Sequence, residues 1–505
     1  MFEGLLAFGH SIASFVTPEA LFWVALSTLV GLVIGALPGL TATMGLTLMT
    51  TMTLKLESNL ALLILICTYV GAIYGGSRSA ILLNIPGTPA SAAACLDGHQ
   101  LARQGLAGRA MGIATSGSVL GTLIGMFFLA WFTPILGEMA LKFGAYEFFW
   151  LALFGVVISG TLTGDDPLKG WIAGLAGLFI AGIGQEGLFA YERFTFGNRD
   201  LAGGIGLVPA LVGAFGLAEL LVSVKERQGP VAINPFDSVI PKLKDITGYW
   251  KTILRSGVIG TFVGIIPGVG EDVAAWSSYA AAKRASKEPE KFGHGSIDGL
   301  MAAETGDNAC VPGAVIPVLT LAIPGSAPAA VLLAAMLIHG VRPGPLIMVE
   351  APQFVYDVVA MMMFATLGIL LYGLTLTRFM IRVLQVRKTI IVPIILVLCT
   401  IGTFALAGRL FDVYVMVAFG LVGFVLRQYN YPMAPLVLGI VLGDLLEKNL
   451  RRGLVLSEGD LAPFVTRPIS AVLFATIVLI VLFRFEWMRR LVRRLAGRPD
   501  PSPAP

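Results

Sequence analysis

Two short stretches of glycine, proline and small polar residues interrupt apolar segments in the two halves of the chain. An anion that enters a low-dielectric cavity loses its hydration and needs replacement hydrogen-bond donors. Backbone amides at the amino terminus of a half-helix supply such donors, helped by about half a positive charge from the helix dipole. The alternative is that these residues only cap helices at tight turns. We predict a substrate cradle made of Asn84, Gly87, Thr88 and Ser91 in the first half and Gly325, Ser326 and Ala327 in the second.

A second set of residues offers oxygen ligands for sodium, which unwound backbone near a broken helix can also provide. Ionisable residues inside a membrane are costly and by default mark a pathway. For the two aspartates in this set, the alternative is a position at the membrane interface, where that cost falls away. The sodium candidates are Gly39, Thr41 and Thr43 in one turn, Gly268 and Asp272 in another, and the pair Asp307 and Asn308.

Arg78 lies within an otherwise apolar run, and a guanidinium can bind a carboxylate through two parallel hydrogen bonds. We therefore include Arg78 among the candidate substrate ligands; the alternative is a side chain that reaches the interface or pairs with an acid. Glu219 has the position of a charge at a helix end. The four cysteines occur singly, which indicates neither a disulfide framework nor a metal site.

These residues sit in a chain whose composition is that of a membrane protein, with 56% hydrophobic and 13% charged residues. Soluble domains have about 25% charged residues. Crossing the roughly 30 Å hydrocarbon layer takes about 20 apolar residues, and such segments recur from Leu21 to Phe483. We predict an all-α polytopic membrane protein with about 10–13 transmembrane segments. The amino terminus shows no cleavable leader, so we expect the first span to stay in the membrane.

Three further segments, at 41–54, 80–96 and 326–340, are too short or too interrupted for confident crossings. Proline removes a backbone hydrogen-bond donor, and glycine gives the backbone more conformational freedom. We therefore predict broken or re-entrant helices there, with amides facing a cavity. Interrupted segments at matching places in two halves are typical of a transporter binding site near the bilayer midplane.

An internal repeat relates the two halves of the chain. Gly31, Gly35, Pro38 and Gly39 recur as Gly260, Gly264, Pro267 and Gly268 at one constant offset, and NIPGTPAS resembles AIPGSAPAA further on. Two phrases in the same order indicate duplication. The first repeat follows a neutral amino terminus and the second a basic linker, which favours inverted structural repeats. We predict a first repeat at 1–223, a basic cytoplasmic linker at 224–251, a second repeat at 252–468, and a terminal span with a basic tail at 469–505.

The segments YGGSRSAILLNIPGTPASAAACLDGHQLARQG (74–105) and ETGDNACVPGAVIPVLTLAIPGSAPAAVLL (304–333) resemble the signature regions of the TctA family, the large membrane subunit of tripartite tricarboxylate transporters. The resemblance covers essentially the whole chain, and Arg78 departs from the small or uncharged residue expected at its position. It implies a multi-pass protein of the bacterial inner membrane. It also implies a small membrane subunit of the TctB type, a periplasmic solute-binding protein of the TctC type, and sodium as the coupling ion, with no other cofactor.

We therefore expect a secondary active transporter that imports a tricarboxylate, a dicarboxylate or a related organic acid by sodium symport and alternating access, and not an enzyme. An elevator-like movement is favoured by fold-level analogy alone. The alternative is an intramembrane enzyme that acts on a lipid-linked or anionic substrate. It would need a nucleophile with a base or a metal cluster, and the four histidines show no HExxH or similar spacing. A channel or an assembly scaffold would not explain why the broken helices are duplicated.

Overall fold

Helices make up 80% of the computed structural model of this protein, which describes residues 2–37, 39–162, 166–186, 190–225, 238–384 and 388–483. The predicted tail, the linker residues 226–237 and Pro38 lie outside these residues. In the described residues, two short antiparallel strands, β1 (Gly184–Gln185) and β2 (Glu192–Arg193), form the one sheet. Six helices are long and apolar enough to cross a membrane: α2 (Pro18–Ala36), α4 (Ser58–Leu83), α6 (Ala107–Ala140), α7 (Ala145–Leu162), α18 (Gln353–Thr375) and α21 (Leu410–Gln428).

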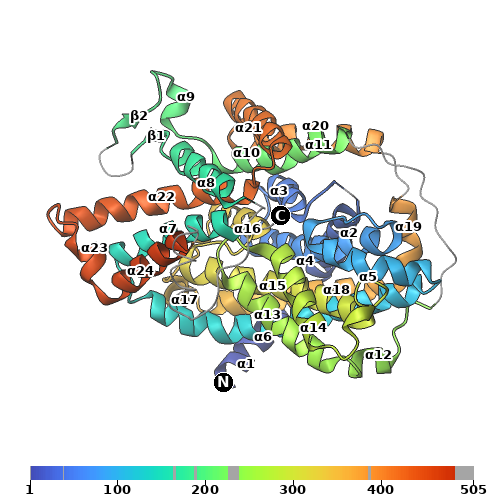
Figure 1. Ribbon diagram of the computed structural model, residues 1–505. Helices are drawn as coiled ribbons and strands as arrows, with labels where there is room; N and C mark the ends of the chain where they lie inside the picture. The colour runs from blue at the N-terminus through green and yellow to red at the C-terminus, as the bar shows by residue number, and fades with distance from the viewer. Residues whose placement is uncertain are drawn as a thin grey trace, which may run out of the picture.

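Shorter apolar helices accompany these six, and the predicted all-α polytopic membrane fold is confirmed. Figure 1 shows α7, α8, α22 and α24 at one side of the molecule, α2, α5 and α19 at the other, and α4, α15 and α16 between them. Besides α6, α7, α18, α21 and the two strands, the elements outside the repeats described below are α1 (Phe2–Phe15), α8 (Pro167–Ala181), α9 (Arg199–Ala202), α10 (Leu207–Leu211), the π-helix η2 (Val212–Leu217), α11 (Ala218–Lys225), α12 (Leu243–Thr247), η3 (Pro289–Lys291), α17 (Ile347–Glu350), α19 (Thr377–Leu384), α20 (Lys388–Ala407), α22 (Met433–Leu456), α23 (Ala462–Thr466) and α24 (Pro468–Leu482).

The internal repeat of the sequence corresponds to two sets of helices with the same order. The first set is α2, α3 (Ala42–Met52), α4, and the 3-10 turn η1 (Pro89–Ser91) with α5 (Ala92–Arg103). The second is α13 (Trp250–Ile265), α14 (Gly270–Ala285), α15 (Ile297–Leu321) and α16 (Ala327–Ile338). The long helices α4 and α15 both end at a left-handed residue, Asn84 with φ 57° and Ala322 with φ 56°. The domain boundaries given above stay a prediction.

Close glycine contacts join the first and third helices of each repeat. A Cβ atom on Gly35 of α2 would lie 2.0 Å from the carbonyl oxygen of Ala72 on α4, and one on Gly264 of α13 would lie 2.6 Å from that of Cys310 on α15. These distances leave no room for a side chain. The glycines of the repeated phrase therefore set the spacing of these helices, as small residues do in membrane helix pairs.

The two repeats run through the molecule in opposite directions. Ala36 at the end of α2 and Leu82 near the end of α4 belong to one hydrophobic cluster with Ile253 and Leu300, which lie near the starts of α13 and α15. In the first repeat α2 and α4 therefore run toward this end of the molecule, whereas in the second repeat the equivalent helices α13 and α15 run away from it. This is the inverted arrangement that the sequence predicts.

Three segments of the chain, at 99–109, 225–255 and 283–291, carry the excess of lysine and arginine that marks a cytoplasmic side, and their described parts meet at this same end. Arg109 Nη2 lies 2.6 Å from Asp245 Oδ1, which joins the start of α6 to α12. Gln104 Nε2 donates a hydrogen bond of 3.1 Å to the carbonyl oxygen of His294, in the loop between α14 and α15. The basic segments therefore share one face of the protein, as the topology signal requires.

Candidate functional site

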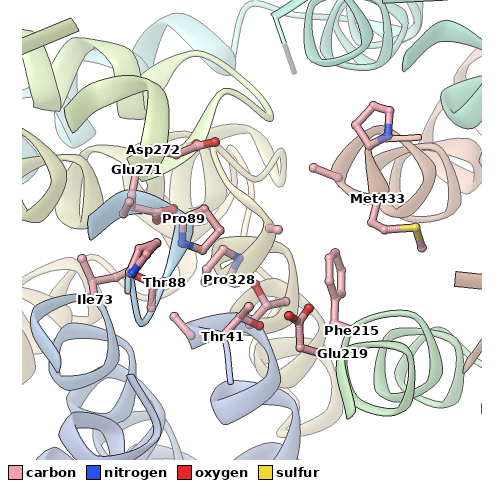
Figure 2. Close-up of a pocket in the computed structure, with 18 of the residues that line it drawn as sticks. Thr41, Ile73, Thr88, Pro89, Phe215, Glu219, Glu271, Asp272, Pro328 and Met433 are labelled. Atoms are coloured by element: carbon pink, nitrogen blue, oxygen red, sulfur yellow. The ribbon is translucent and has the colours of Figure 1, made fainter. Parts of the chain in front are cut away.

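A cavity of about 580 Å³ lies where the interrupted segments of both repeats meet (Figure 2). One wall consists of the turns that precede α3, η1, α14 and α16, and the other consists of η2, α11 and the junction of α21 with α22. Figure 2 shows Phe215 and Met433 across the cavity from Thr88 and Glu271. The lining residues are Gly39, Thr41, Ala42, Thr43, Ile73, Ile85, Pro86, Gly87, Thr88, Pro89, Ala90, Phe215, Glu219, Val222, Gly268, Val269, Gly270, Glu271, Asp272, Ala327, Pro328, Arg427, Tyr431, Pro432, Met433 and Ala434.

Four half-helices begin at this cavity and leave it in two directions. The far ends of α3 and α16 meet where Thr53 Oγ1 lies 3.3 Å from His339 Nε2. The other two, α5 and α14, extend toward the basic end of the molecule, where Tyr279 donates a hydrogen bond of 2.9 Å to Asp97. All four therefore direct their amino termini, the positive ends of their dipoles, toward the cavity.

In the first half, the structure brings Gly87 and Thr88 of the predicted cradle into the cavity lining. Asn84 does not line the cavity; it is exposed at the left-handed end of α4. The hydroxyl of Ser91 accepts a hydrogen bond of 3.2 Å from the amide of Thr88 and donates one of 2.8 Å to the carbonyl oxygen of Thr88. Ser91 therefore stabilises the turn without lining the cavity. Substrate binding by these residues stays a prediction.

In the second half, Ala327 lines the cavity, whereas Gly325 packs against α13. Ser326 is buried and caps α16, which is the alternative that the sequence left open. Its hydroxyl also lies 2.7 Å from the hydroxyl of Tyr69 on α4, and Tyr69 donates a hydrogen bond to Glu271 at the start of α14. A buried polar relay therefore joins the half-helix starts of the second repeat to a long helix of the first.

All five predicted sodium ligands in the two Pro-Gly turns, Gly39, Thr41, Thr43, Gly268 and Asp272, line the cavity. Thr41 caps α3 through its hydroxyl, and Asp272 lies in the first turn of α14. A carboxylate in the first turn of a helix interacts favourably with the helix dipole. The structure thus places these candidates together, beside the predicted carboxylate cradle.

The remaining sodium candidates, Asp307 and Asn308, lie inside α15 and do not line the cavity. Asn308 Nδ2 donates to Asp307 Oδ1 at 2.7 Å and to Ser118 Oγ at 3.0 Å. Glu304, which the sequence analysis did not single out, accepts hydrogen bonds from Ser77 at 2.7 Å and Ser118 at 3.0 Å. Glu304 Oε1 and Asn308 Oδ1 have no hydrogen-bond partner among the described residues. We name Glu304, Asp307 and Asn308 the α15 cluster.

Arg78 is fully buried on α4 and does not line the cavity. Its guanidinium carbon lies 4.1 Å from the centre of the Tyr74 ring, and its nitrogens donate to Thr115 Oγ1 at 3.3 Å and to the carbonyl oxygen of Met111 at 3.4 Å. It also interacts electrostatically with Glu304. The side chain therefore does not extend to an interface. Its acidic partner is Glu304 of the α15 cluster.

The opposite wall holds two functional candidates that sequence reasoning did not find. Glu219 of α11 and Arg427 of α21 form an ion pair in the cavity lining. Arg427 is the only cationic side chain among the described lining residues. The two residues are separated by 208 positions in the chain, so no local pattern joins them.

The chain matches the tripartite tricarboxylate transporter TctA family over residues 21–438. It is also similar to two curated proteins of Agrobacterium vitis. The "uncharacterized 52.8 kDa protein in TAR-I ttuC' 3'region" is 35% identical over 460 residues, which cover 91% of this chain and 92% of that protein. The "uncharacterized protein in TAR-II ttuC' 3'region" is 36% identical over 212 residues, which cover 42% of this chain and 88% of that protein. No solved structure matches the chain significantly.

Proposed function

The chain belongs to the tripartite tricarboxylate transporter TctA family, and on this basis we propose that it is the large membrane subunit of a sodium-coupled importer of tricarboxylates, dicarboxylates or related organic acids. The observation that carries the proposal is the convergence of four half-helix amino termini on one cavity between two inverted repeats. Substrate sites of secondary transporters are built in this way from discontinuous helices.

The carboxylate binds at the wall made by the half-helices. The amides of Ala90 at the start of η1 and of Ala327 at the start of α16 replace the water that the anion loses. The four helix dipoles add positive potential without placing a fixed cation on this wall. A site of this kind binds an anion and releases it more readily than a cluster of arginines would.

Sodium enters as a co-substrate with the acid. The described lining carries three carboxylates, Glu219, Glu271 and Asp272, against the single cation Arg427. An anion that enters this cavity therefore needs a cation beside it, since buried like charges repel strongly at low dielectric. Asp272 and the adjacent turns supply oxygen ligands in the cavity. The α15 cluster offers a second position for sodium, because Asn308 Oδ1 and a carboxylate oxygen of Glu304 lack partners among the described residues.

Transport follows by alternating access, in which one group of helices moves relative to the other and exposes the cavity to each side in turn. The partners are a small membrane subunit of the TctB type and a periplasmic binding protein of the TctC type, and the complex works in the bacterial inner membrane. The family to which the chain belongs supports this assembly.

Uptake by the reconstituted complex tests the proposal. Proteoliposomes that contain this chain and both partner proteins are supplied with radiolabelled citrate or succinate, with and without an inward sodium gradient. We expect uptake that requires all three proteins and rises with the sodium gradient. Uptake that does not depend on the sodium gradient would contradict sodium symport, and the absence of uptake by the complete complex would contradict the importer itself.

A further inference from the structure

The ion pair between Glu219 and Arg427 lies on the wall opposite the half-helices. Figure 2 shows Glu219 on the same side as Phe215, with Thr88 and Asp272 across the cavity. Glu219 is the second residue of α11, which follows the π-helix η2, and Arg427 is in the last turn of α21, before the lining residues that start α22. This wall belongs to neither set of repeated helices. A ligand that fills the cavity is therefore in reach of two chemically different surfaces.

Arg427 is only partly satisfied by its partner. Its Nη1 atom donates to Glu219 Oε2, whereas its Nε atom is buried and has no hydrogen-bond partner among the described residues. The side chain of Arg427 remains 24% exposed, and that of Glu219 is 11% exposed. A guanidinium carries five donors in a rigid fork that matches a carboxylate. Arg427 therefore has donors left for a second acceptor.

We propose that Arg427 binds a second carboxylate of the transported acid while a first carboxylate lies at the half-helix starts. The inference rests on the proposed function and identifies the residue that selects acids with two or more carboxylates. An acid with one carboxylate engages one wall and gains nothing from the other. Glu219 is the counter-ion that holds the Arg427 side chain in place before the acid arrives.

The role of Glu219 follows from its charge. Its carboxylate keeps Arg427 ordered, but it also repels an incoming anion and offsets the positive charge that the anion needs. Glutamine at this position still accepts a hydrogen bond from Arg427 and removes the negative charge. The two members of the pair therefore have opposite effects on acid binding, which a purely structural ion pair does not produce.

Calorimetric binding to the purified full-length protein, in detergent and in a buffer that contains sodium, tests the inference, with citrate, succinate and acetate as probes. We expect Arg427→Gln to weaken citrate and succinate binding by about tenfold or more, because a charged, fork-shaped hydrogen bond is lost. We expect the citrate affinity of Arg427→Lys to lie between that of the wild type and that of Arg427→Gln, since lysine keeps the positive charge but not the fork-shaped set of donors. Glu219→Gln strengthens citrate binding by about threefold or more, because it removes a neighbouring like charge. Acetate binding is unchanged in Arg427→Gln.

Arg409→Gln is the matched control, because Arg409 pairs with Asp412 at the opposite end of the same helix and lies outside the cavity. This variant should bind citrate like the wild type. The inference is overturned if Arg427→Gln binds citrate as tightly as Arg409→Gln does, or if Glu219→Gln weakens citrate binding. Either result leaves the importer proposal intact, provided that the wild type binds citrate. A wild-type protein that binds none of the three acids contradicts the importer proposal instead.

Discussion

Asp97 of α5 accepts four hydrogen bonds, three from the loop between α14 and α15 and one from α14 itself. Its carboxylate accepts the amides of Gly293, Gly295 and Ser296 and the hydroxyl of Tyr279, at distances between 2.8 and 2.9 Å. The side chain is fully buried. Because the four donors come from the second repeat and Asp97 from the first, this residue joins the two repeats at the basic end of the molecule.

We expect Asp97→Ala to lower the free energy of unfolding by about 2–4 kcal/mol, because it leaves several buried donors without an acceptor. Thermal unfolding of the detergent-solubilised protein measures the change. The control is Glu288→Ala, which removes the exposed partner of Lys291 and should leave the melting temperature close to that of the wild type. Equal melting temperatures for the two variants would show that Asp97 does not hold the repeats together.

Asp245 provides a pH-dependent contact at the same end. Hydrogen bonds from Arg109 lower the pKa of Asp245 below its ordinary value, although desolvation acts in the opposite direction. The ion pair therefore contributes fully to the free energy of unfolding above about pH 3.9, the pKa of an aspartate in the unfolded chain. This contribution is lost as the pH falls through the lower pKa of Asp245 in the folded protein. We expect Asp245→Asn to be less stable than the wild type by about 1 kcal/mol at pH 7, with a difference that shrinks in acid. Thermal unfolding between pH 7 and pH 3 tests this, and a difference independent of pH would contradict it.

The half-helices α3 and α16 are too short to cross a membrane. Helix α3 has 11 residues and α16 has 12, and at about 1.5 Å per residue each covers roughly half of the hydrocarbon layer. The turn before α16 is held against the repeat that contains it, because Gly325 N donates to the carbonyl oxygen of Ala314 at 3.3 Å. The equivalent turn of the first repeat has the same contact, from Gly87 N to the carbonyl oxygen of Gly76 at 3.3 Å.

Gly325→Ala tests the position of this turn. The added Cβ would lie 2.0 Å from the carbonyl oxygen of Gly264, so the turn must shift and misplace the start of α16. We expect the initial rate of citrate uptake by the reconstituted complex to fall by about tenfold or more, since small displacements in a binding site are costly. Gly9→Ala is the control, because a Cβ there meets no other atom within 4 Å, and its uptake should equal that of the wild type. Normal uptake by Gly325→Ala would contradict a fixed turn.

The sequence predicts this element-scale design well, because proline and glycine act locally on the backbone. The Pro-Gly phrases predict the short helices, and eight of the fifteen candidate site residues line the cavity: Gly39, Thr41, Thr43, Gly87, Thr88, Gly268, Asp272 and Ala327. Long-range packing decides the rest. Arg78 is buried against Tyr74 rather than turned to the cavity, and the partners Glu219 and Arg427 come from helices far apart in the chain.

At the scale of the whole molecule, inversion of the repeat brings the parts of the site together. Two parallel repeats would direct equivalent half-helices, such as α3 and α14, toward the same side of the membrane. In this protein, α3 and α16 leave the cavity toward one end, and α5 and α14 leave it toward the other. The amino termini of all four face one site, and the cavity also has a wall from helices outside the repeats. This arrangement suits a site that must be reached from both sides in turn.

The central claim is that an acid occupies the cavity between the half-helix starts and Arg427. The most direct measurement is an electron cryomicroscopy structure of the complex with citrate and sodium. The account predicts citrate density with one carboxylate at hydrogen-bonding distance from the amides near Thr88 and Ala327, and another at the guanidinium of Arg427. Citrate bound elsewhere in the protein, with this cavity filled by side chains, would contradict it.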